Sequence, residues 1–305
     1  MTSHHRRPPA AVTIGVFDGV HLGHRALVER TVAGAAALGG EAVAVTFDPH
    51  PAAVLAPEHV PPFLTDPTEK TGRLIEAGAD RVAVLSFTRE LASLTPEEFV
   101  EGHLARLASL KLLVIGPDFA LGRGRVGNAE RLAAIGVERG FTVEVVPARL
   151  DGNEVISSSR IRRLVQRGEV RGAARLLGRA PSVSGTVVTG DGRGRTIGVP
   201  TANLAVPVER CRPAAGVYAV RVRVEGESRP AHPGVMNVGN RPTFDGTELR
   251  FEVHRLDWSG EAVGRTWSVE LVERLREERR FDRVEALVTQ IRSDIETARQ
   301  LLAAQ

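Results

Sequence analysis

The chain has 305 residues, of which 42% are hydrophobic, 25% charged and 4% aromatic. This composition is that of an ordinary globular protein and excludes the disordered, collagenous and membrane-spanning classes. The 40 basic residues nearly balance the 37 acidic ones, and the formal charge of +3 is too even for a typical nucleic-acid-binding protein. At roughly 100–200 residues per domain, this length predicts two domains.

Cysteine usage and the amino terminus indicate where the protein works. Cys211 is the only cysteine, which excludes an intramolecular disulfide framework and a thiolate cluster for zinc or iron–sulfur. Asp18, His21 and His24 interrupt the apolar stretch near the amino terminus before it reaches the length of a signal-peptide core. No run approaches the ~20 apolar residues of a membrane span. We therefore expect a cytoplasmic protein with neither a membrane nor a nucleic-acid partner.

The first half of the chain alternates short apolar runs with longer helical patterns. The apolar runs predict buried parallel strands, at 12–17, 42–47, 81–87, 111–116 and 142–147. Apolar residues at three- and four-residue spacing predict helices between them, at 22–38, 68–77, 96–107 and 128–139. This alternation predicts an α/β fold, a Rossmann-like parallel sheet with helices on both faces.

A domain boundary is predicted after two further helical stretches, 158–166 and 170–177. Gly178 and Pro181 follow them and form a helix stop signal. We therefore expect domains at 1–179 and 180–305.

The second half has short β-type runs separated by glycine and proline. They lie at 183–188, 216–224, 234–239, 249–256 and 266–275, and they predict an antiparallel barrel or sandwich. The chain closes with an amphipathic segment, 281–302, whose apolar residues share one helical face. We expect it to be a helix packed against the barrel.

The strongest local signal is the sequence GVFDGVHLGH at 15–24, where the first strand meets the first helix. Ligands of open α/β sheets bind at such strand ends. Gly15 and Gly19 would let the backbone approach a phosphate at the helix N-terminus, and two imidazoles, His21 and His24, could donate hydrogen bonds to a triphosphate. A metal site or a purely structural histidine pair are the alternatives, although no carboxylate or cysteine cluster completes a metal site.

HxGH at this place resembles the signature of the nucleotidylyltransferase superfamily, whose members transfer a nucleoside monophosphate from a triphosphate and release pyrophosphate. The sequence ISSSRIR at 156–162 is similar to a second motif of that superfamily. There Ser158, Ser159 and Arg162 would grip the phosphates at a helix start. By itself a serine run before a helix is more often an N-cap.

Two other phosphate-type patterns are weaker. The segment 122–127 matches GxGxxG, but its first glycine comes six residues after a predicted strand ends, whereas a dinucleotide fingerprint turns at once. A Walker P-loop is excluded, because the Lys70-Thr71 pair follows Glu69 instead of glycine.

In the second half, a dense glycine segment precedes the sequence PTAN at 200–203. The backbone of Gly190, Gly192, Gly194 and Arg195 could cradle phosphate oxygens, although such a segment also suits a plain hairpin loop. Thr201 and Asn203 offer a hydroxyl and a carboxamide oxygen of the kind that Mg²⁺ accepts beside a nucleotide.

Glu252 lies in a β-type run, where strand alternation turns its carboxylate either to solvent or to a pocket as a general base. Alternation alone favours solvent.

Taken together, these motifs resemble those of the bacterial bifunctional riboflavin kinase/FAD synthetase family. The resemblance extends from about Val12 to Leu302 and includes the further segments 45–51, 94–99, 115–119, 192–204, 216–220, 237–244, 251–257 and 275–281. PTAN after a glycine segment is nearly diagnostic of a flavokinase, and the order of the motifs on one chain is highly specific.

The resemblance implies that the first domain adenylylates FMN to FAD with ATP. His21 and His24 would stabilise the triphosphate, and Gly15, Phe17, Asp18 and Gly19 would form the nucleotide loop. Ser158, Ser159 and Arg162 would bind the pyrophosphate portion, and His50 and Asp118 would line the flavin side. Because the FMN phosphate is already a competent nucleophile, positioning and charge stabilisation suffice for the step.

The resemblance implies that the second domain phosphorylates riboflavin to FMN, with a flavokinase-like barrel. Thr201 and Asn203 would hold Mg²⁺ with ATP, and the segment Gly190 to Arg195 would cover the phosphates. Glu252 would accept the proton of the attacking ribityl hydroxyl, and Arg276 would lie near the flavin. The implied partners are riboflavin, FMN and ATP, and we expect a monomer or weak homo-oligomer.

The sequence departs from the family pattern at Ala120 and Val199, where the family has an arginine and a phenylalanine. One alternative is therefore a nucleotidylyltransferase of the same fold that acts on a modified flavin or another phosphorylated metabolite. The other is a non-catalytic regulator that binds flavin or nucleotide, which the retained catalytic-type residues argue against.

Overall fold

The structure is a computed structural model that describes residues 8–190, 194, 198–227, 230–243, 246–258 and 260–303, without the side chains of 241–243 and 246–248. The chain divides into two compact units, Met1–Ser158 and Ser159–Gln305, and each is described by itself below. All but the first residue of the two helices before Gly178 thus lies in the second unit. The functional boundary at 179/180 stays a prediction.

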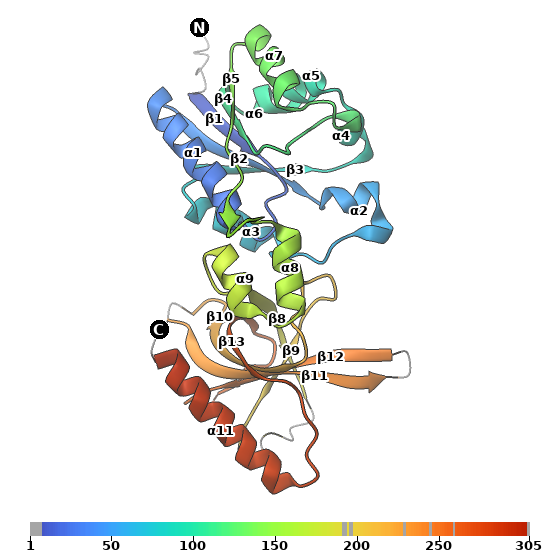
Figure 1. The fold of residues 1–305 in the computed structure, drawn as a ribbon, viewed down its shortest axis with the longest axis vertical. Coiled ribbons are helices and arrows are strands. Elements are labelled where there is room, and N and C mark those ends of the chain that lie inside the picture. Colours follow the sequence, from blue (N-terminus) through green and yellow to red (C-terminus); the bar gives the residue numbers. More distant parts are fainter. Residues whose placement is uncertain are drawn as a thin grey trace. The chain divides into compact units, whose positions relative to one another are not determined.

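The first unit is built on a five-stranded parallel sheet with strand order β3-β2-β1-β4-β5 (Figure 1). The strands are β1 (Pro9–Ile14), β2 (Glu41–Asp48), β3 (Arg81–Ser86), β4 (Ser109–Ile115) and β5 (Thr142–Val145). The five predicted strands are thus confirmed. The order reverses between β1 and β4, which places the switch point of the sheet, where ligands of such folds bind, at the carboxyl end of β1.

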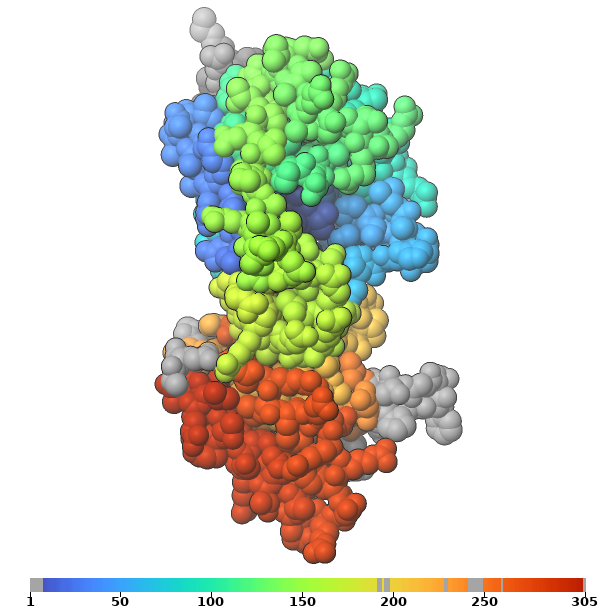
Figure 2. Space-filling model, viewed as in Figure 1, coloured from blue at the N-terminus to red at the C-terminus, as the bar shows by residue number. Residues whose placement is uncertain are grey.

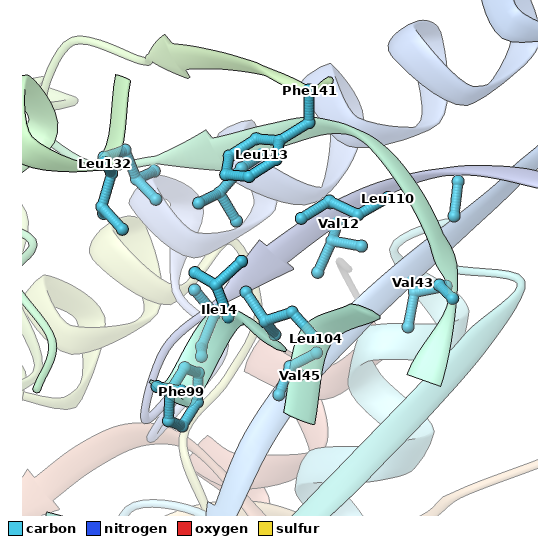
Figure 3. Close-up of a cluster of buried hydrophobic side chains, with 14 of the residues drawn as sticks. Val12, Ile14, Val43, Val45, Phe99, Leu104, Leu110, Leu113, Leu132 and Phe141 are labelled. Carbon is cyan, nitrogen blue, oxygen red and sulfur yellow. The ribbon is translucent and has the colours of Figure 1, made fainter. Parts of the chain in front are cut away.

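Helices cover both faces of this sheet, as expected from the alternating pattern. The face of Val12 and Leu113 packs against the helical segments after β3 and the helix before β5, and this cluster is drawn in Figure 3. The opposite face, with Ala11 and Ala44, packs against the first long helix. The helical segments are α1 (Leu22–Leu38), α3 (Pro67–Glu76), α5 (Pro96–Phe99), a π-helical turn (Val100–Leu104), α6 (Ala105–Leu107) and α7 (Ala129–Arg139).

Several short elements of the first unit were not predicted from the sequence. They are α2 (Pro51–Leu55), η1 (Pro57–His59), α4 (Arg89–Ser93), η3 (Arg123–Arg125) and the hairpin β6 (Leu150–Asp151) with β7 (Glu154–Val155). Each has five residues or fewer, which is too short for a periodic pattern to show.

The second unit contains two helices and a closed antiparallel barrel. Helices α8 (Ser158–Gln166) and α9 (Val170–Leu177) have the predicted bounds, and α9 ends at Gly178 with a φ of 72°. The order of the barrel strands is β10-β11-β12-β9-β8-β13. Their bounds are β8 (Ser182–Val188), β9 (Ala202–Ala205), β10 (Gly216–Val224), β11 (His232–Thr243), β12 (Gly246–Arg255) and β13 (Thr266–Arg276).

The barrel is filled by Tyr218, Met236, Trp267 and other side chains that are almost fully buried. Helix α11 (Val284–Ala303) packs on the outside of the barrel, where Ala298 and Leu302 contact residues of β10, β11 and β13. Figure 2 shows β13 and α11, at the red end of the colour scale, over much of the surface of this unit on the side in view.

The terminal helix begins at Val284, three residues after the predicted start. Phe281 belongs to the preceding loop, where its ring lies under the guanidinium groups of Arg276 and Arg279. Phe281, which the sequence pattern placed at the start of the helix, therefore packs against two arginines of the loop and the end of β13 instead.

Candidate functional site

The loop between β1 and α1 has a strained backbone. Phe17 and Val20 have positive φ angles of 53° and 39°, and Gly19 has one of 83°. A β-branched residue at positive φ is a conformational outlier that costs about 1–3 kcal/mol and persists only where the surroundings impose it. Such strain concentrates at ligand-binding loops, and this loop lies at the switch point of the sheet.

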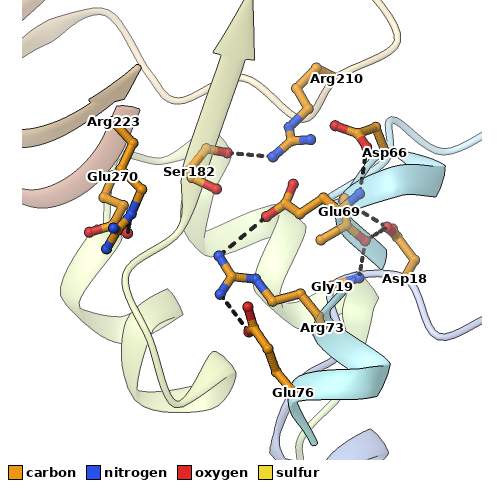
Figure 4. Close-up of polar contacts among 11 residues, drawn as sticks. Asp18, Gly19, Asp66, Glu69, Arg73, Glu76, Ser182, Arg210, Arg223 and Glu270 are labelled. Atoms are coloured by element: carbon orange, nitrogen blue, oxygen red, sulfur yellow. Dashed lines mark hydrogen bonds and ion pairs between the residues drawn. The ribbon is translucent and has the colours of Figure 1, made fainter. Parts of the chain in front are cut away.

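Asp18 anchors this loop to the segment before α3. Its carboxylate accepts hydrogen bonds from the backbone N–H groups of Leu64, at 2.9 and 3.1 Å, and Thr65, at 3.1 Å. The Thr65 hydroxyl donates to the same carboxylate at 3.4 Å and accepts from the Gly19 N–H at 3.0 Å. Asp18 and Gly19 are labelled in Figure 4. Asp18 is buried. Its position fits a residue that holds the loop in shape; a direct contact with nucleotide stays a prediction.

The two histidines of the motif form a stacked pair, with ring centroids 3.6 Å apart and planes 18° from parallel. His21 is the N-cap of α1, and its Nδ1 accepts the hydrogen bond of the His24 N–H at 3.3 Å. Because Nδ1 is an acceptor, Nε2 is the ring nitrogen of His21 that can donate a hydrogen bond. The ring of Phe17 meets His24 edge-on at 5.2 Å. The pair is thus held as a rigid unit at the helix start.

His24 is held uncharged. Burial is the main cause that lowers its pKa well below the ordinary value of 6.5, and the charges of His21 and Lys70 lower it further. Its buried Nδ1 has no hydrogen-bond partner among the residues that the structure describes. A buried ring nitrogen without a partner is unusual and is available to a ligand.

Lys70 is a residue of this region that the sequence reading missed. Its side chain is buried, and Nζ donates to the carbonyl of Phe47 at 2.9 Å, at the end of β2. Burial lowers the pKa of Lys70, while Asp18 and Asp48 favour its charged form. The sequence does contain one signal for Lys70. It is one of only two lysines among 40 basic residues, so a lysine at this position is unusual for the chain.

The topology places two other predicted residues at the same edge of the sheet. His50 is the N-cap of α2, just after β2, and its Nδ1 accepts from the Ala52 N–H at 3.0 Å. Asp118 follows β4 and is exposed. Because β2 and β4 flank β1 in parallel, the loops that carry these residues leave the sheet at the edge where the histidine motif begins.

The serine-rich motif begins helix α8. Ser158 is the last residue of the first unit, and its Oγ donates to the carbonyl of Asp18 at 2.8 Å. Ser159 and Arg162 follow on α8 in the second unit, where Arg162 is buried and its carbonyl accepts from the Cys211 thiol at 3.9 Å. Ser158 thus contacts the histidine-motif loop directly.

The segment that matches GxGxxG does not form a dinucleotide fingerprint. It closes on itself through a bridge between Leu121 and Gly127, and a Cβ at Gly122 or Gly127 would lie about 3 Å from Pro96. The glycines are therefore required for packing against the start of α5, and the sequence-based rejection of a Rossmann NAD site agrees with this geometry.

The second unit contains a cavity of about 350 Å³ between the barrel and α11, which we call cavity A. Its polar side includes Thr201, Asn203, Glu252 and Arg276, and its apolar side includes Phe281 and residues of α11. The full lining is Gly194, Val199, Thr201, Asn203, Val217, Val235, Asn237, Arg250, Glu252, His254, Arg276, Glu278, Arg279, Phe281, Leu287, Ile291, Asp294 and Ile295.

A second cavity, cavity B, has a volume of about 690 Å³. It is lined by Val187, Val188, Thr189, Gly190, Pro200, Thr201, Ala202, Asn203, Val253, Arg255, Trp258, Gly260, Glu261, Ala262, Val263 and Trp267. Thr201 and Asn203 line both cavities. The two cavities therefore share the wall that carries the predicted Mg²⁺ ligands.

Strand β12 separates the two cavities. Glu252 and His254 line cavity A, whereas the alternate residues Val253 and Arg255 line cavity B. Alternation does turn Glu252 away from the barrel core, as the pattern alone indicates, but the space on that side is a cavity bounded by α11. Glu252 thus lines cavity A beside α11 while 34% of its side chain stays exposed, and its role as a general base stays a prediction.

Asn203 lies on a strand that the sequence reading missed. The short strand β9 pairs with β12, and Asn203 is the direct partner of Glu252. A Cβ on Gly190 would lie 1.8 Å from Nδ2 of Asn203, and one on Gly194 would lie 3.1 Å from Oγ1 of Thr201. Gly190 thus makes room for the Asn203 side chain, and Gly194 mainly for the Val199 carbonyl, which would lie 2.3 Å from such a Cβ. Gly192 and Arg195 lie outside the described residues.

His254 was also missed, although it shares the strand and the cavity with Glu252. Its Nδ1 lies 2.8 Å from the carbonyl of Pro200. Since a carbonyl only accepts, Nδ1 carries the proton. The β9–β12 ladder runs from Phe251 to Val253, so this side-chain contact ties the residue just after the ladder to the turn before Thr201.

Comparisons with known proteins agree on one family. Residues 3–160 match the family model described as FAD synthetase, and residues 177–302 match the one described as riboflavin kinase. A bifunctional riboflavin kinase/FMN adenylyltransferase from Escherichia coli (strain K12) is 39% identical over 290 residues, or 95% of this chain and 91% of that protein. One from Pseudomonas fluorescens is 39% identical over 305 residues, or 98% of this chain and 96% of that protein.

A crystal structure described as a macrolide-efflux protein from Streptococcus pneumoniae has the same fold, with a TM-score of 0.86 and 35% identity over 96% of this chain and 94% of that one. Its name describes that protein only. Within the described residues, no helix of this chain is long and apolar enough to cross a membrane. Both family models and the near full-length relatives agree with the motifs seen in the sequence, and the chain belongs to the family of bifunctional riboflavin kinase/FMN adenylyltransferases.

Proposed function

We propose that each activity of this family resides in one part of the chain, the adenylyltransferase in residues 1–179 and the kinase in 180–305. The chain phosphorylates riboflavin to FMN with ATP and adenylylates FMN to FAD with release of pyrophosphate. The matched ranges of the two family models, 3–160 and 177–302, support this division.

Riboflavin would occupy cavity A. Its isoalloxazine ring is planar and largely apolar, which suits the wall formed by Phe281 and Ile291, while Glu252 faces the same space. The carboxylate of Glu252 would accept the proton of the terminal ribityl hydroxyl. The hydroxyl oxygen then bonds to the γ-phosphorus of ATP, the bond from that phosphorus to the β-bridging oxygen breaks, and ADP leaves.

ATP would enter from cavity B and present its γ-phosphate at the wall shared with cavity A. Thr201 and Asn203 fit a Mg²⁺ ion that accompanies the nucleotide, because they offer neutral oxygen ligands. Gly190 has no side chain and so leaves room for the Asn203 amide beside it. When bound, Mg²⁺ would neutralise phosphate charge. In the described residues there is no group of three or more His, Cys, Asp or Glu that could hold a metal alone, so phosphate oxygens would complete the ligand set.

In the adenylyltransferase, the loop from Gly15 to Gly19, with Phe17 and Asp18, would shape the nucleotide site, and His21 and His24 would stabilise the triphosphate. A phosphate oxygen of FMN would attack the α-phosphorus, and the bond to the pyrophosphate would break. His21 can donate from Nε2, since Nδ1 is already an acceptor. Ser158, Ser159 and Arg162 would hold the departing pyrophosphate, and His50 and Asp118 would lie on the flavin side.

One observation carries the kinase assignment: Glu252 faces a cavity, directly opposite Asn203. The test is mass spectrometry of the products that the purified protein makes from riboflavin, ATP and Mg²⁺, beside a second reaction that starts from FMN. FMN and FAD in the first reaction, and FAD in the second, are expected. If riboflavin yields FMN but no FAD forms in either reaction, the adenylyltransferase assignment is contradicted. If FMN yields FAD but riboflavin yields no product, the kinase assignment is contradicted.

Two alternatives have their own outcome in this experiment. No product with either flavin, together with binding of FMN, would favour a flavin-binding regulator, and turnover of a modified flavin alone would favour a changed specificity. The location in the cytoplasm and the state of monomer or weak homo-oligomer stay predictions.

A further inference from the structure

Arg276, at the end of β13, is held by a carboxylate of the terminal helix. Its Nε lies 3.2 and 3.0 Å from the two oxygens of Asp294, and its Nη2 donates to Oδ2 at 2.9 Å. Such a two-point contact fixes the plane of the guanidinium as well as its position. Arg276 and Asp294 both line cavity A.

Asp294 is itself almost completely enclosed, with 5% of its surface exposed. Besides Arg276, its carboxylate accepts from Nε2 of Gln290 at 2.7 Å, one turn earlier on α11. Gln290 in turn accepts from Arg279. Burying a carboxylate removes it from water, which costs free energy even when three donors surround it. An apolar residue at this position of α11 would pack without that cost. We therefore look for a functional reason for Asp294 in the wall of cavity A.

The contacts leave two N–H groups of Arg276 available. A guanidinium has five N–H groups. Asp294 takes those of Nε and one of Nη2, and the carbonyl of Glu277 takes one of Nη1 at 3.0 Å. One N–H on each of Nη1 and Nη2 has no partner among the described residues. These two donors can meet acceptors on a ligand, such as a ring nitrogen or a ring carbonyl.

We propose that Asp294 is a positioning residue for flavin recognition, which orients Arg276 so that its two remaining N–H groups meet the carbonyl-bearing edge of the isoalloxazine ring. This inference rests on the assignment of riboflavin to cavity A. Asp294 acts through Arg276, whose guanidinium it orients. The proposed base Glu252 lies on another strand. The Arg276–Asp294 pair therefore affects binding of the flavin and not the phosphoryl transfer step.

A double-mutant cycle on riboflavin binding tests this inference. The full-length variants Asp294→Asn, Arg276→Gln and the double variant are titrated with riboflavin by fluorescence quenching. Because each single change removes the same oriented contact, each should weaken binding about tenfold, roughly the effect of one hydrogen bond to a charged group. The double variant should also lose about tenfold, since the second change has nothing left to remove.

The matched control is Asp257→Asn. Asp257, just after β12, forms another two-point ion pair with α11, with Arg299 at 2.6 and 3.1 Å, and it is exposed and outside cavity A. Its removal should leave riboflavin affinity unchanged. A control that lowered affinity as much as Asp294→Asn would show that any loosening of α11 has this effect, and it would overturn the positioning role.

Steady-state kinetics separate positioning from unfolding. Asp294→Asn should raise the KM for riboflavin about tenfold while kcat and the KM for ATP stay near wild type, and FMN adenylylation by the same sample should be unchanged. Additive losses in the cycle, about a hundredfold in the double variant, would overturn the inference. Failure of the wild-type protein to phosphorylate riboflavin would instead overturn the assignment of cavity A.

Discussion

Glu252 on β12 lies directly opposite Asn203 on β9 in the barrel. Opposite residues of an antiparallel pair have Cβ atoms about 4.5–5.5 Å apart and point to the same side of the sheet. A carboxylate that could take a proton and an amide that could bind a metal ion beside phosphate are thus held together by backbone hydrogen bonds. The distance between these two functions is therefore fixed by strand pairing and does not depend on a flexible loop.

Replacement of this carboxylate should separate the two activities. Glu252→Gln should lower riboflavin phosphorylation by about 10²–10⁴-fold, the usual contribution of a general base, and leave FMN adenylylation intact. Glu270→Gln is the control, because Glu270 is on the same barrel but pairs with Arg223 outside cavity A. Product formation from riboflavin and from FMN is measured for each protein. Equal loss of both activities in Glu252→Gln would contradict separate sites.

The converse change concerns the histidine pair. His24→Ala should abolish most FMN adenylylation, because it removes one half of the stacked pair and the ring nitrogen left open to a ligand. Riboflavin phosphorylation should continue. His59→Ala, at an exposed histidine of the same unit, serves as control. The assignment fails if His24→Ala makes FAD from FMN at the wild-type rate.

The low pKa of His24 also predicts a dependence of stability on pH. The folded chain keeps His24 neutral where the unfolded chain, with an ordinary pKa of 6.5, already binds a proton. Stability is therefore fully present above about pH 6.5 and falls as the pH drops below it, by up to about 1.4 kcal/mol per pH unit. Urea unfolding of wild type and His24→Phe between pH 5 and 7.5 measures this. A variant with an equally steep pH dependence would show that other groups cause it.

The glycine next to Asn203 offers a steric test. Gly190→Ala would place a Cβ 1.8 Å from Nδ2 of Asn203, so the amide must move away from the wall between the cavities. We expect at least a tenfold loss of kinase activity and a higher requirement for Mg²⁺ in a titration of activity. Gly172→Ala on α9, whose added Cβ would make only ordinary contacts with Leu164 of α8, should have little effect. Unchanged Mg²⁺ dependence in Gly190→Ala would argue against Asn203 as a ligand.

Asp18 should matter for the shape of the nucleotide loop. Asp18→Ala removes the acceptor of the Leu64 and Thr65 N–H groups, and each buried donor left without a partner costs about 1–3 kcal/mol. We expect a lower melting temperature of the first unit and weaker adenylylation with normal kinase activity. Asp80→Ala, which removes the acceptor of one backbone N–H at Ala42, should destabilise without a selective loss of adenylylation.

The sequence was sufficient for the elements whose residues repeat over several turns or alternate over a full strand. Helix α1 and helix α8 have the predicted bounds, because each combines a periodic apolar face with a defined start. The four-residue strand β9 was missed, since ANLA has no clear alternation and follows a proline. It exists because β8 and β12 pair with it on both sides, which is tertiary information.

The candidate site was predicted only where its residues form local patterns. The histidine motif and PTAN are local patterns and could be read directly. The surroundings of Glu252 could not, because they depend on α11, which follows β12 only after another strand. Lys70 and Asp294 gave no motif, and His254 lay in a segment of the family resemblance with no role attached to it. Their roles depend on partners far along the chain, such as Pro200 for His254 and Arg276 for Asp294.

Because β12 alternates between cavities A and B, the identity of both sites depends on its register. A shift of one residue against β9 would turn Phe251 and Val253 toward the side of α11 and bring Glu252 among the apolar side chains of the barrel. The three pairs from Phe251–Leu204 to Val253–Ala202 therefore set which cavity receives each side chain. An insertion or deletion of a single residue in β12 should be far more damaging than a conservative substitution at any one of its positions.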